Sequence, residues 1–411
     1  MKLLAISEHY YPRVGGTVNY VHETLCALAD LGVEAELVVP GPEPRGWRPD
    51  GMAPQPYKLS WLEAGYPERG DPTREQRYDF CRQVNALVAG RVAGADRPDI
   101  LHVLFGLFVM EVLDTGRLRR AGLPCIATVH NVPPMECRQI AHDAPLPARM
   151  REALRLQMVG FKNRARLKKH RYDGYVVPSG QVRDLLAPVI QADVVVIGHG
   201  TTTDLQAIMH PPETRRPKGL VRLLTAGGYA PHKRQHIIPE TAERLRAAGV
   251  EFRWDVVGPS GRVAGYHALV AADAAQRGVA DWVHLHESVS FADLGGLYDR
   301  ANLYVQPSVE EGFCLTALDA AAAGLPVIAS RAGALPDIAQ ASGGALAPSA
   351  PQALADAIAD FVTQDLWRDA GAQAAQVRQA FSWAKAATQL LTHYRLRTHH
   401  TDRTVIEGQQ A

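Results

Sequence analysis

The sequence predicts an α/β protein built from two doubly wound domains, each a parallel sheet with helices on both faces. Three observations support this prediction. Apolar runs of strand length alternate with segments of helical periodicity, and this alternation occurs twice. The length of 411 residues exceeds what one hydrophobic core usually supports. Between the two alternations, a stretch rich in Gly, Pro and charged residues at 198–219 has the composition of an interdomain linker.

The first 40 residues form a predicted βαβ unit. Leu3–Ile6 is an apolar run, and a loop containing two adjacent glycines follows it up to Gly16. Apolar residues then recur at helical spacing until Gly32, and a strand follows at 35–39. The stretch 41–75 has no clear period, and we interpret it as an irregular insertion. Further parallel strands are predicted at 100–104, 125–129, 175–177 and 194–197.

The second alternation begins after the linker. Its strands are predicted at 223–226, 252–257, 283–286, 303–306 and 327–329. Its helices are predicted near 236–248, 291–300, 313–323, 351–363 and 366–380. Because ligands of doubly wound sheets bind beyond the carboxyl ends of the strands, we expect the site in a central cleft between the two domains.

Composition excludes several classes of protein. With 44 Lys+Arg against 43 Asp+Glu, the formal net charge of +1 gives no general attraction for nucleic acid. No stretch reaches the roughly 18 apolar residues of a transmembrane helix, and Glu8 and His9 cut short the apolar run at the N-terminus. The five cysteines form neither a CxxC pair nor a disulfide framework. A cytoplasmic protein is therefore expected.

The segment after Pro307 carries the most informative chemistry. An apolar strand ends there, an acidic pair and Gly312 form a tight loop, and a helix is predicted to begin near Phe313. Free N–H groups at a helix start bind phosphate, whereas the carboxylate of Glu311 is suited to sugar hydroxyls. Asp319 follows about two turns later and is suited to a second diol. This layout fits a nucleotide diphosphate sugar; the alternative is one solvated loop acid and one surface helix acid.

These residues and their flanks resemble the retaining GT-B glycosyltransferases of family 4, whose signature is E-x7-E. Glu311 matches the first acid, and Asp319 stands where the second glutamate is usual. The resemblance implies an N-terminal Rossmann-like acceptor domain over 1–205 and a donor domain over 206–380, with a crossover helix at about 381–400 that returns to the first domain. Further matches cover 11–16, 128–130, 255–258, 297–308, 321–330 and 381–383.

The family implies a role for each matching residue. Lys233 and the amides of Phe313, Cys314 and Leu315 would stabilise the leaving diphosphate. Glu311 would position the donor sugar, beside Gly312, and Asp319 would bind the ribose. In the N-terminal domain, Gly16 would let its loop approach the diphosphate, and His130 would lie near the donor sugar. The implied reaction transfers a sugar from a UDP- or GDP-sugar to a hydroxyl with retention, and catalytic roles fall to Glu311, Lys233 and His130.

One departure from the family concerns the phosphate site. The family usually has an arginine five residues before the lysine, and this chain has Gly228. Arg234 and His232 are the candidates to supply the missing charge. Two alternatives remain. A nucleotide-sugar epimerase or hydrolase could use the same cleft and would turn over donor without acceptor. A non-catalytic binding protein, which the missing arginine allows, would bind donor and never consume it.

The partners are less well specified. The expected acceptor is a hydroxyl of a glycolipid or polysaccharide intermediate, with a small molecule of secondary metabolism as the alternative. No metal or other cofactor is expected, because the histidine pairs lack companion acids and cysteines. The segment 149–171 carries nine basic residues and one acid, which is typical either of a solvated helix face or of a peripheral contact with the inner face of a membrane.

Overall fold

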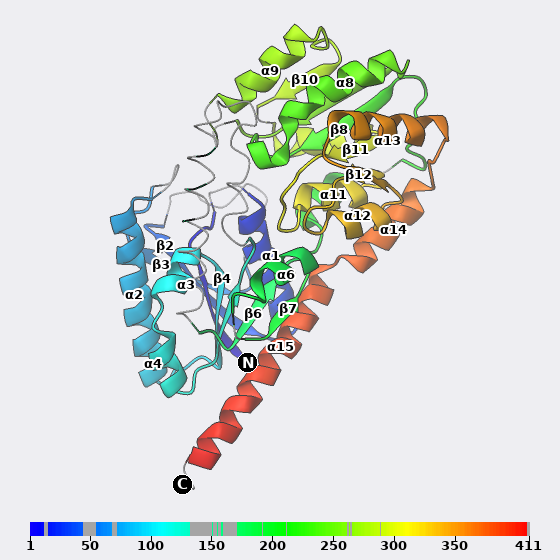
Figure 1. The fold of residues 1–411 in the computed structure, drawn as a ribbon. Coiled ribbons are helices and arrows are strands. Elements are labelled where there is room, and N and C mark those ends of the chain that lie inside the picture. The colour runs from blue at the N-terminus through cyan, green and yellow to red at the C-terminus, as the bar shows by residue number, and fades with distance from the viewer. Residues whose placement is uncertain are drawn as a thin grey trace. The chain divides into compact units, whose positions relative to one another are not determined.

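The computed structural model divides the chain into two compact units. Unit 1 comprises Met1–Val132, Phe161–Gly200 and Trp383–Ala411, and unit 2 comprises Pro133–Gly160 and Thr201–Ser382 (Figure 1). Each unit is described by itself. The structure describes residues 1–11, 15–43, 55–67, 72–131, 171–190, 192–210, 212–260, 263, 265–287 and 289–408, together with 150, 154 and 158.

Unit 1 contains a seven-stranded sheet in the order β3-β2-β1-β4-β5-β6-β7, with every pair of neighbours parallel. The predicted strands are confirmed, but the interpretation of 41–75 as wholly irregular is wrong, because β3 lies within it. None of the six residues of β3 is buried, so the apolar signal is weak there. The strands are β1 (Lys2–Ser7), β2 (Glu34–Gly41), β3 (Lys58–Glu63), β4 (Ile100–Phe105), β5 (Cys125–Thr128), β6 (Gly174–Val177) and β7 (Val194–Val196).

The helices of unit 1 show the apolar faces and capping residues that stabilise helices. In α1, the buried residues Val18, Val21, Leu25 and Leu28 form one apolar face. The second helix, which the sequence did not predict, starts after a capping box at Thr73 and has few buried residues. The last helix packs against α1. The helices are α1 (Gly16–Asp30), α2 (Arg74–Ala93), α3 (Leu107–Val112), α4 (Thr115–Arg120), α6 (Gly180–Leu186) and α15 (Trp383–Gly408).

Unit 2 contains a six-stranded parallel sheet in the order β10-β9-β8-β11-β12-β13. All five predicted strands are confirmed, and among the described strands of unit 2 the sequence missed only β13, because two residues carry no periodic signal. The strands are β8 (Val221–Ala226), β9 (Phe252–Val257), β10 (Val283–His286), β11 (Leu303–Gln306), β12 (Val327–Ala329) and β13 (Ala345–Leu346).

Helices cover this second sheet, and several start at points that the sequence placed differently. The helix expected from 366 begins at Ala370, because the Asp369 side chain caps it. The helix expected from 313 begins at Leu315, because Cys314 adopts a left-handed conformation with φ of 83°. The segment expected to be linker contains α7. The helices are α7 (Thr203–Ile208), α8 (Ile238–Ala247), α9 (Tyr266–Gln276), α10 (Phe291–Arg300), α11 (Leu315–Ala322), α12 (Leu335–Ala341), α13 (Pro351–Thr363) and α14 (Ala370–Ala380).

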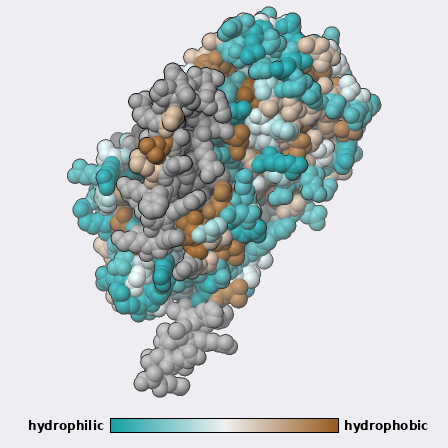
Figure 2. Space-filling model, in the orientation of Figure 1, coloured by the Kyte–Doolittle hydropathy of each residue, from teal (hydrophilic) through white to brown (hydrophobic). Residues whose placement is uncertain are grey.

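The sheet of unit 2 has a hydrophobic core on each face. Successive residues of a strand alternate between the two cores, as the pleat of a sheet requires. In β8, Leu224 belongs to one core and Leu223 to the other; in β11, Tyr304 and Val305 divide in the same way. In the view of Figure 2, the described surface is mainly hydrophilic, with hydrophobic residues in small groups. These buried strands hold the loops at their carboxyl ends in place.

Candidate functional site

Lys233 and Glu311 form a buried ion pair in unit 2. The Nζ atom of Lys233 lies 2.6 Å from Oε1 of Glu311, and the two side chains are 17% and 7% exposed. The lysine follows β8, and the glutamate follows β11. Because β8 and β11 are parallel neighbours, their following loops leave the same edge of the sheet. A backbone hydrogen bond of 2.9 Å, donated by Val309 N–H to the His232 carbonyl, connects the two loops.

Glu311 is held in its charged form. Burial alone would raise the pKa of its carboxyl group, but the charge and hydrogen bond of Lys233, with a hydrogen bond from Ser308, hold this pKa below its usual value. The Ser308 hydroxyl donates to Oε1 at 2.7 Å and accepts from the Gln306 amide at 2.7 Å. The Tyr304 hydroxyl in turn lies 2.9 Å from Oε1 of Gln306. A chain of buried hydrogen bonds therefore leads from β11 to the carboxylate.

The loop after β8 brings the backbone close to Lys233. Gly227 has φ of 147°, a conformation that a side chain rarely adopts, and its Cα faces the lysine side chain. The buried side chain of Gln235 donates to the Gly228 carbonyl at 3.1 Å and so fixes the turn. Gly258, after β9, packs directly on the Gly227 carbonyl and leaves no space for a Cβ. This packing of glycines sets the position from which Lys233 extends.

Arg234, one of the two candidates to supply the missing charge, has a partner within unit 2. Its guanidinium donates to the Ser349 carbonyl at 3.1 Å, and its backbone is left-handed with φ of 61°. Its binding of donor phosphate stays a prediction. His232 is buried, and its charge when protonated would favour the ionised form of Glu311.

Asp319 has partners that the sequence did not reveal. Its two carboxylate oxygens accept hydrogen bonds from the Thr202 backbone N–H at 2.8 Å and the Thr202 hydroxyl at 3.0 Å, and the residue is 5% exposed. Thr202 directly precedes α7. In this structure Asp319 anchors the start of unit 2, so the ribose role implied by the family would require it to share these oxygens.

The loop before α11 presents backbone rather than side chains. Phe313 is buried and packs edge-to-face on Phe381, with ring centroids 6.2 Å apart. Burial raises the pKa of the Cys314 thiol to about 12, so the thiol stays protonated near neutral pH. Gly312 is half-buried, and Leu315 begins the helix. The groups of this loop available to an anion are therefore amides near the helix start.

His130 and Gly16 belong to unit 1. The His130 Nε2 lies 3.0 Å from the Leu104 carbonyl; since a carbonyl only accepts, Nε2 carries the proton and Nδ1 is left as an acceptor. Burial lowers the pKa of His130 to about 4, so the ring is neutral near pH 7. Gly16 is exposed and begins α1, and most of the matched loop before it, at 12–14, lies outside the described residues.

Glu8 is a candidate that the sequence analysis did not propose. It directly follows β1 at the carboxyl edge of the unit 1 sheet, is 6% exposed and accepts a hydrogen bond of 3.1 Å from Val109 N–H. Desolvation raises its pKa to about 7 despite the opposing charge of Arg77. Gly106, with φ of 137°, leaves room for this side chain, since a Cβ there would lie 2.8 Å from Glu8 Cγ. Burial is the property that sets Glu8 apart from most other acids that the structure describes. The sequence could not reveal it, because no local pattern indicates whether a residue after a strand is buried.

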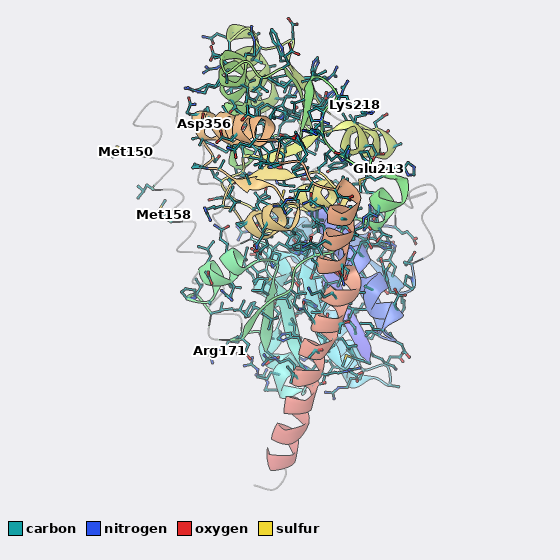
Figure 3. The ribbon with its side chains drawn as sticks, turned by 90° about the vertical axis from the view of Figure 1, so that its right-hand side faces the viewer. Met150, Met158, Arg171, Glu213, Lys218 and Asp356 are labelled. Atoms are coloured by element: carbon teal, nitrogen blue, oxygen red, sulfur yellow. The ribbon has the colours of Figure 1, made fainter. Side chains whose placement is uncertain are left out.

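The remaining expectations concern metal and membrane. Within the described ranges, no group of three or more His, Cys, Asp or Glu side chains is arranged to hold a metal ion. None of the described helices is both long and apolar enough to cross a membrane. Most of the basic segment 149–171 lies outside the described residues; of its described members, Met150, Leu154 and Met158 are 66%, 60% and 60% exposed (Figure 3).

Comparison with known proteins gives consistent matches. The family model described as Glycosyltransferase Family 4 matches residues 14–205, and the model described as Glycosyl transferases group 1 matches residues 221–364. A D-inositol 3-phosphate glycosyltransferase from Thermobispora bispora is 26% identical, covering 96% of this chain and 92% of that protein.

Solved structures with the same fold span nearly the whole chain. Sucrose-phosphate synthase from Thermosynechococcus elongatus aligns with a TM-score of 0.73 at 21% identity, covering 96% of this chain and 98% of that one. The HepE protein of Anabaena, solved in complex with UDP, aligns with a TM-score of 0.63 at 16% identity, covering 96% and 99%. These similarities show a GT-B fold for this chain.

Proposed function

Because the chain belongs to the family 4 glycosyltransferases, we propose that it transfers a sugar from a nucleoside diphosphate donor to an acceptor hydroxyl with retention of anomeric configuration. The observation that carries this proposal is the buried Lys233–Glu311 pair at the shared carboxyl edge of β8 and β11. One member suits a diphosphate and the other suits sugar hydroxyls. The two together match the two halves of such a donor.

The proposed mechanism divides the work between these groups. The ammonium of Lys233 and the amides near the start of α11 neutralise the charge that grows on the leaving diphosphate. Glu311 accepts a hydrogen bond from a donor-sugar hydroxyl and fixes the orientation of the reacting carbon. Leaving group and acceptor share one face of the sugar, and a donor phosphate oxygen takes the acceptor proton. In unit 1, the neutral Nδ1 of His130 is an acceptor suited to a sugar hydroxyl. No metal takes part in this proposal.

The donor and acceptor are proposed from the relatives. HepE was solved with UDP, so UDP-sugars are the first donors to test, with GDP-sugars second. The Thermobispora relative is named for D-inositol 3-phosphate, which makes this compound the first acceptor to test. Lipid-linked glycan intermediates are the second class of acceptor.

Ligand-induced stabilisation tests the donor site. Unfolding temperatures would be measured with UDP, GDP, ADP and their sugar conjugates, for the wild type, Lys233→Ala and Glu311→Ala. A donor at 100 times its dissociation constant adds about 2.7 kcal/mol to stability. We expect Lys233→Ala to lose the response to nucleotide and nucleotide sugar alike, and Glu311→Ala to lose only the additional response to the sugar.

Matched controls are available in the same unit. Lys218 and Asp356 are exposed and lie outside the two site loops (Figure 3), so their alanine variants should respond as the wild type does. Retention is tested by the anomeric coupling constant of the product in proton NMR. If the wild type responds to none of these compounds, the proposed donor site is wrong.

We also propose peripheral membrane contact through the basic segment. Nine basic residues and one acid lie between 149 and 171, and three apolar residues of this segment are exposed. Basic segments bind anionic lipid with about 1 kcal/mol per cation near the surface. Vesicles of phosphatidylglycerol and phosphatidylcholine should therefore sediment with the protein in low salt, and pure phosphatidylcholine vesicles should not. Equal binding to both would contradict the proposal.

A further inference from the structure

We propose that Ser308 is a positioning residue for the donor site. When Lys233 turns to the donor diphosphate, Ser308 keeps the Glu311 carboxylate in place through a hydrogen bond to Oε1. The other oxygen, Oε2, is then left for one donor-sugar hydroxyl. This inference rests on the proposed function and adds a residue that lies outside the E-x7-E signature. It follows from the hydrogen bonds around Glu311 and from the different exposure of its two partners.

The two carboxylate oxygens of Glu311 have different surroundings. Oε1 receives hydrogen bonds from Lys233 Nζ at 2.6 Å and from the Ser308 hydroxyl at 2.7 Å. Among the described residues, none donates a hydrogen bond to Oε2. One oxygen is thus used by the protein and the other is left for a ligand. This asymmetry suits a single hydroxyl rather than a bidentate partner.

The direction of the Ser308 hydrogen bond is fixed by its other partner. Gln306 donates its amide N–H to the Ser308 oxygen at 2.7 Å, so the serine proton is directed to Glu311. Ser308 and Gln306 are both 0% exposed, so bulk water does not compete for these groups. Ser330 also donates to the Ser308 carbonyl and fixes the backbone at the same point. The serine hydroxyl is therefore oriented before any ligand arrives.

Lys233 is a less permanent partner than Ser308. Its side chain is 17% exposed, whereas Ser308 is fully buried. When a diphosphate binds, the ammonium must be shared with its oxygens or transferred to them, and Glu311 then loses its principal counter-charge. A buried carboxylate without a partner takes up a proton. What then remains to keep Glu311 charged is the hydrogen bond from Ser308, together with the charge of His232 when that ring is protonated, and of the two only the hydrogen bond fixes the orientation.

Donor binding measured by titration calorimetry tests this role. The nucleotide sugar that binds the wild type and its parent nucleoside diphosphate would be titrated at pH 6 to 8, in buffers of different ionisation enthalpy. A hydrogen bond to a charged group contributes roughly 1.5–3 kcal/mol, so Ser308→Ala should weaken nucleotide-sugar binding at least tenfold. Binding of the nucleoside diphosphate alone should change less than about threefold.

Proton uptake separates positioning from simple loss of packing. We expect Ser308→Ala to take up a fraction of a proton when it binds the nucleotide sugar, and the wild type to take up none. Ser308→Thr, which keeps the hydroxyl, should restore the wild-type proton balance. Ser349→Ala is the matched control, because Ser349 donates to the Pro307 carbonyl nearby and does not contact Glu311. Wild-type affinity and no proton uptake in Ser308→Ala would overturn the inference.

A measurement without ligand keeps the inference separate from the proposed function. Lys233→Met removes the counter-charge permanently, as donor binding would do temporarily. In this background, Ser308→Ala should raise the Glu311 pKa further, so the double variant should lose stability relative to Lys233→Met as pH rises above about 4.5. Identical pH dependence in the two variants would overturn the role of Ser308, even if no nucleotide sugar binds the wild type.

Discussion

At the scale of single residues, Glu8 and Asp319 show that position in the fold decides what a carboxyl group does. Both are almost fully buried. Asp319 gives both oxygens to Thr202 and serves the structure at the start of α7. Glu8 receives one backbone hydrogen bond, and desolvation raises its pKa to about 7. A buried acid with so little compensation lowers stability, and such acids are often kept for function.

The raised pKa of Glu8 predicts how stability changes with pH. The folded state holds the Glu8 proton up to about pH 7, while the unfolded chain releases it near 4.5, so this group lowers stability as pH rises between these values. Glu8→Gln keeps the acceptor for Val109 N–H and removes the titration. At pH 8 this variant should be more stable than the wild type by about 3 kcal/mol, with no gain near pH 4.5.

The measurement is urea unfolding of both proteins at several pH values. His102 and His130, whose pKa values burial lowers to about 3 and about 4, change stability in the opposite direction, so the prediction concerns the difference between variants. Glu63→Gln, at an exposed position ending β3, is the control and should show no pH-dependent difference. A constant gain at all pH values would show that Glu8 is not protonated in the folded state at neutral pH.

At the scale of elements, the sequence predicted those segments whose side chains are buried with a clear period. All of the strands of four or more buried residues were identified, because apolar runs between turn residues are distinctive. Half-buried β3 and two-residue β13 carry little such signal. The helix α9 was missed because alanines make up much of its sequence and blur the boundary between its two faces.

The site was predictable in part for the same reason. Lys233 and Glu311 were found through a motif, and their proximity follows from parallel neighbouring strands. Ser308 was not found, because its importance depends on a hydrogen bond to a side chain three residues away in a loop. The partner of Asp319 lies 117 residues earlier in the chain, at a distance where no local pattern reports contact.

The loop after β8 predicts opposite outcomes for two glycines. In Gly258→Ala, the new Cβ would overlap the Gly227 carbonyl, so the backbone next to Lys233 must shift. Overpacking of this kind costs about 1–3 kcal/mol, and nucleotide binding should weaken together with stability. In Gly228→Ala, the new Cβ would lie 3.7 Å from Pro259, an ordinary contact.

Thermal unfolding and nucleotide titration of the two alanine variants check this prediction. Gly228→Ala should match the wild type in both, which would also show that the position of the family's usual arginine accepts a side chain. Equal loss of binding in both variants would mean that flexibility of the whole loop, rather than the contact between Gly258 and Gly227, positions the lysine.

At the scale of the whole molecule, unit 1 is completed by a distant part of the chain. The Tyr394 hydroxyl on α15 lies 2.6 Å from Nδ1 of His102 on β4, and both residues are 0% exposed. The other ring nitrogen of His102, Nε2, lies 2.8 Å from the Thr128 hydroxyl oxygen, and the Tyr20 hydroxyl on α1 lies 3.0 Å from the same oxygen. This buried polar chain fixes the register of α15 against the sheet, because each member has a partner only in one arrangement.

Removal of one hydroxyl tests that chain. Tyr394→Phe keeps the ring and leaves a buried imidazole nitrogen without its partner, which should cost about 1–3 kcal/mol in the free energy of unfolding. Denaturant unfolding followed by circular dichroism measures this loss. Tyr78→Phe, at an exposed ring of α2, should change stability by less than about 0.5 kcal/mol. If Tyr394→Phe lost no more stability than Tyr78→Phe, the packing of α15 and not the polar chain would hold this helix on the sheet.

The late position of α15 also affects how the protein is made. A ribosome delivers the whole sheet of unit 1 and the whole of unit 2 before it delivers Tyr394. Until then, α1 lacks the helix that packs on it, and His102 lacks its phenol. The nascent chain therefore carries an unfinished first unit until α15 has been translated.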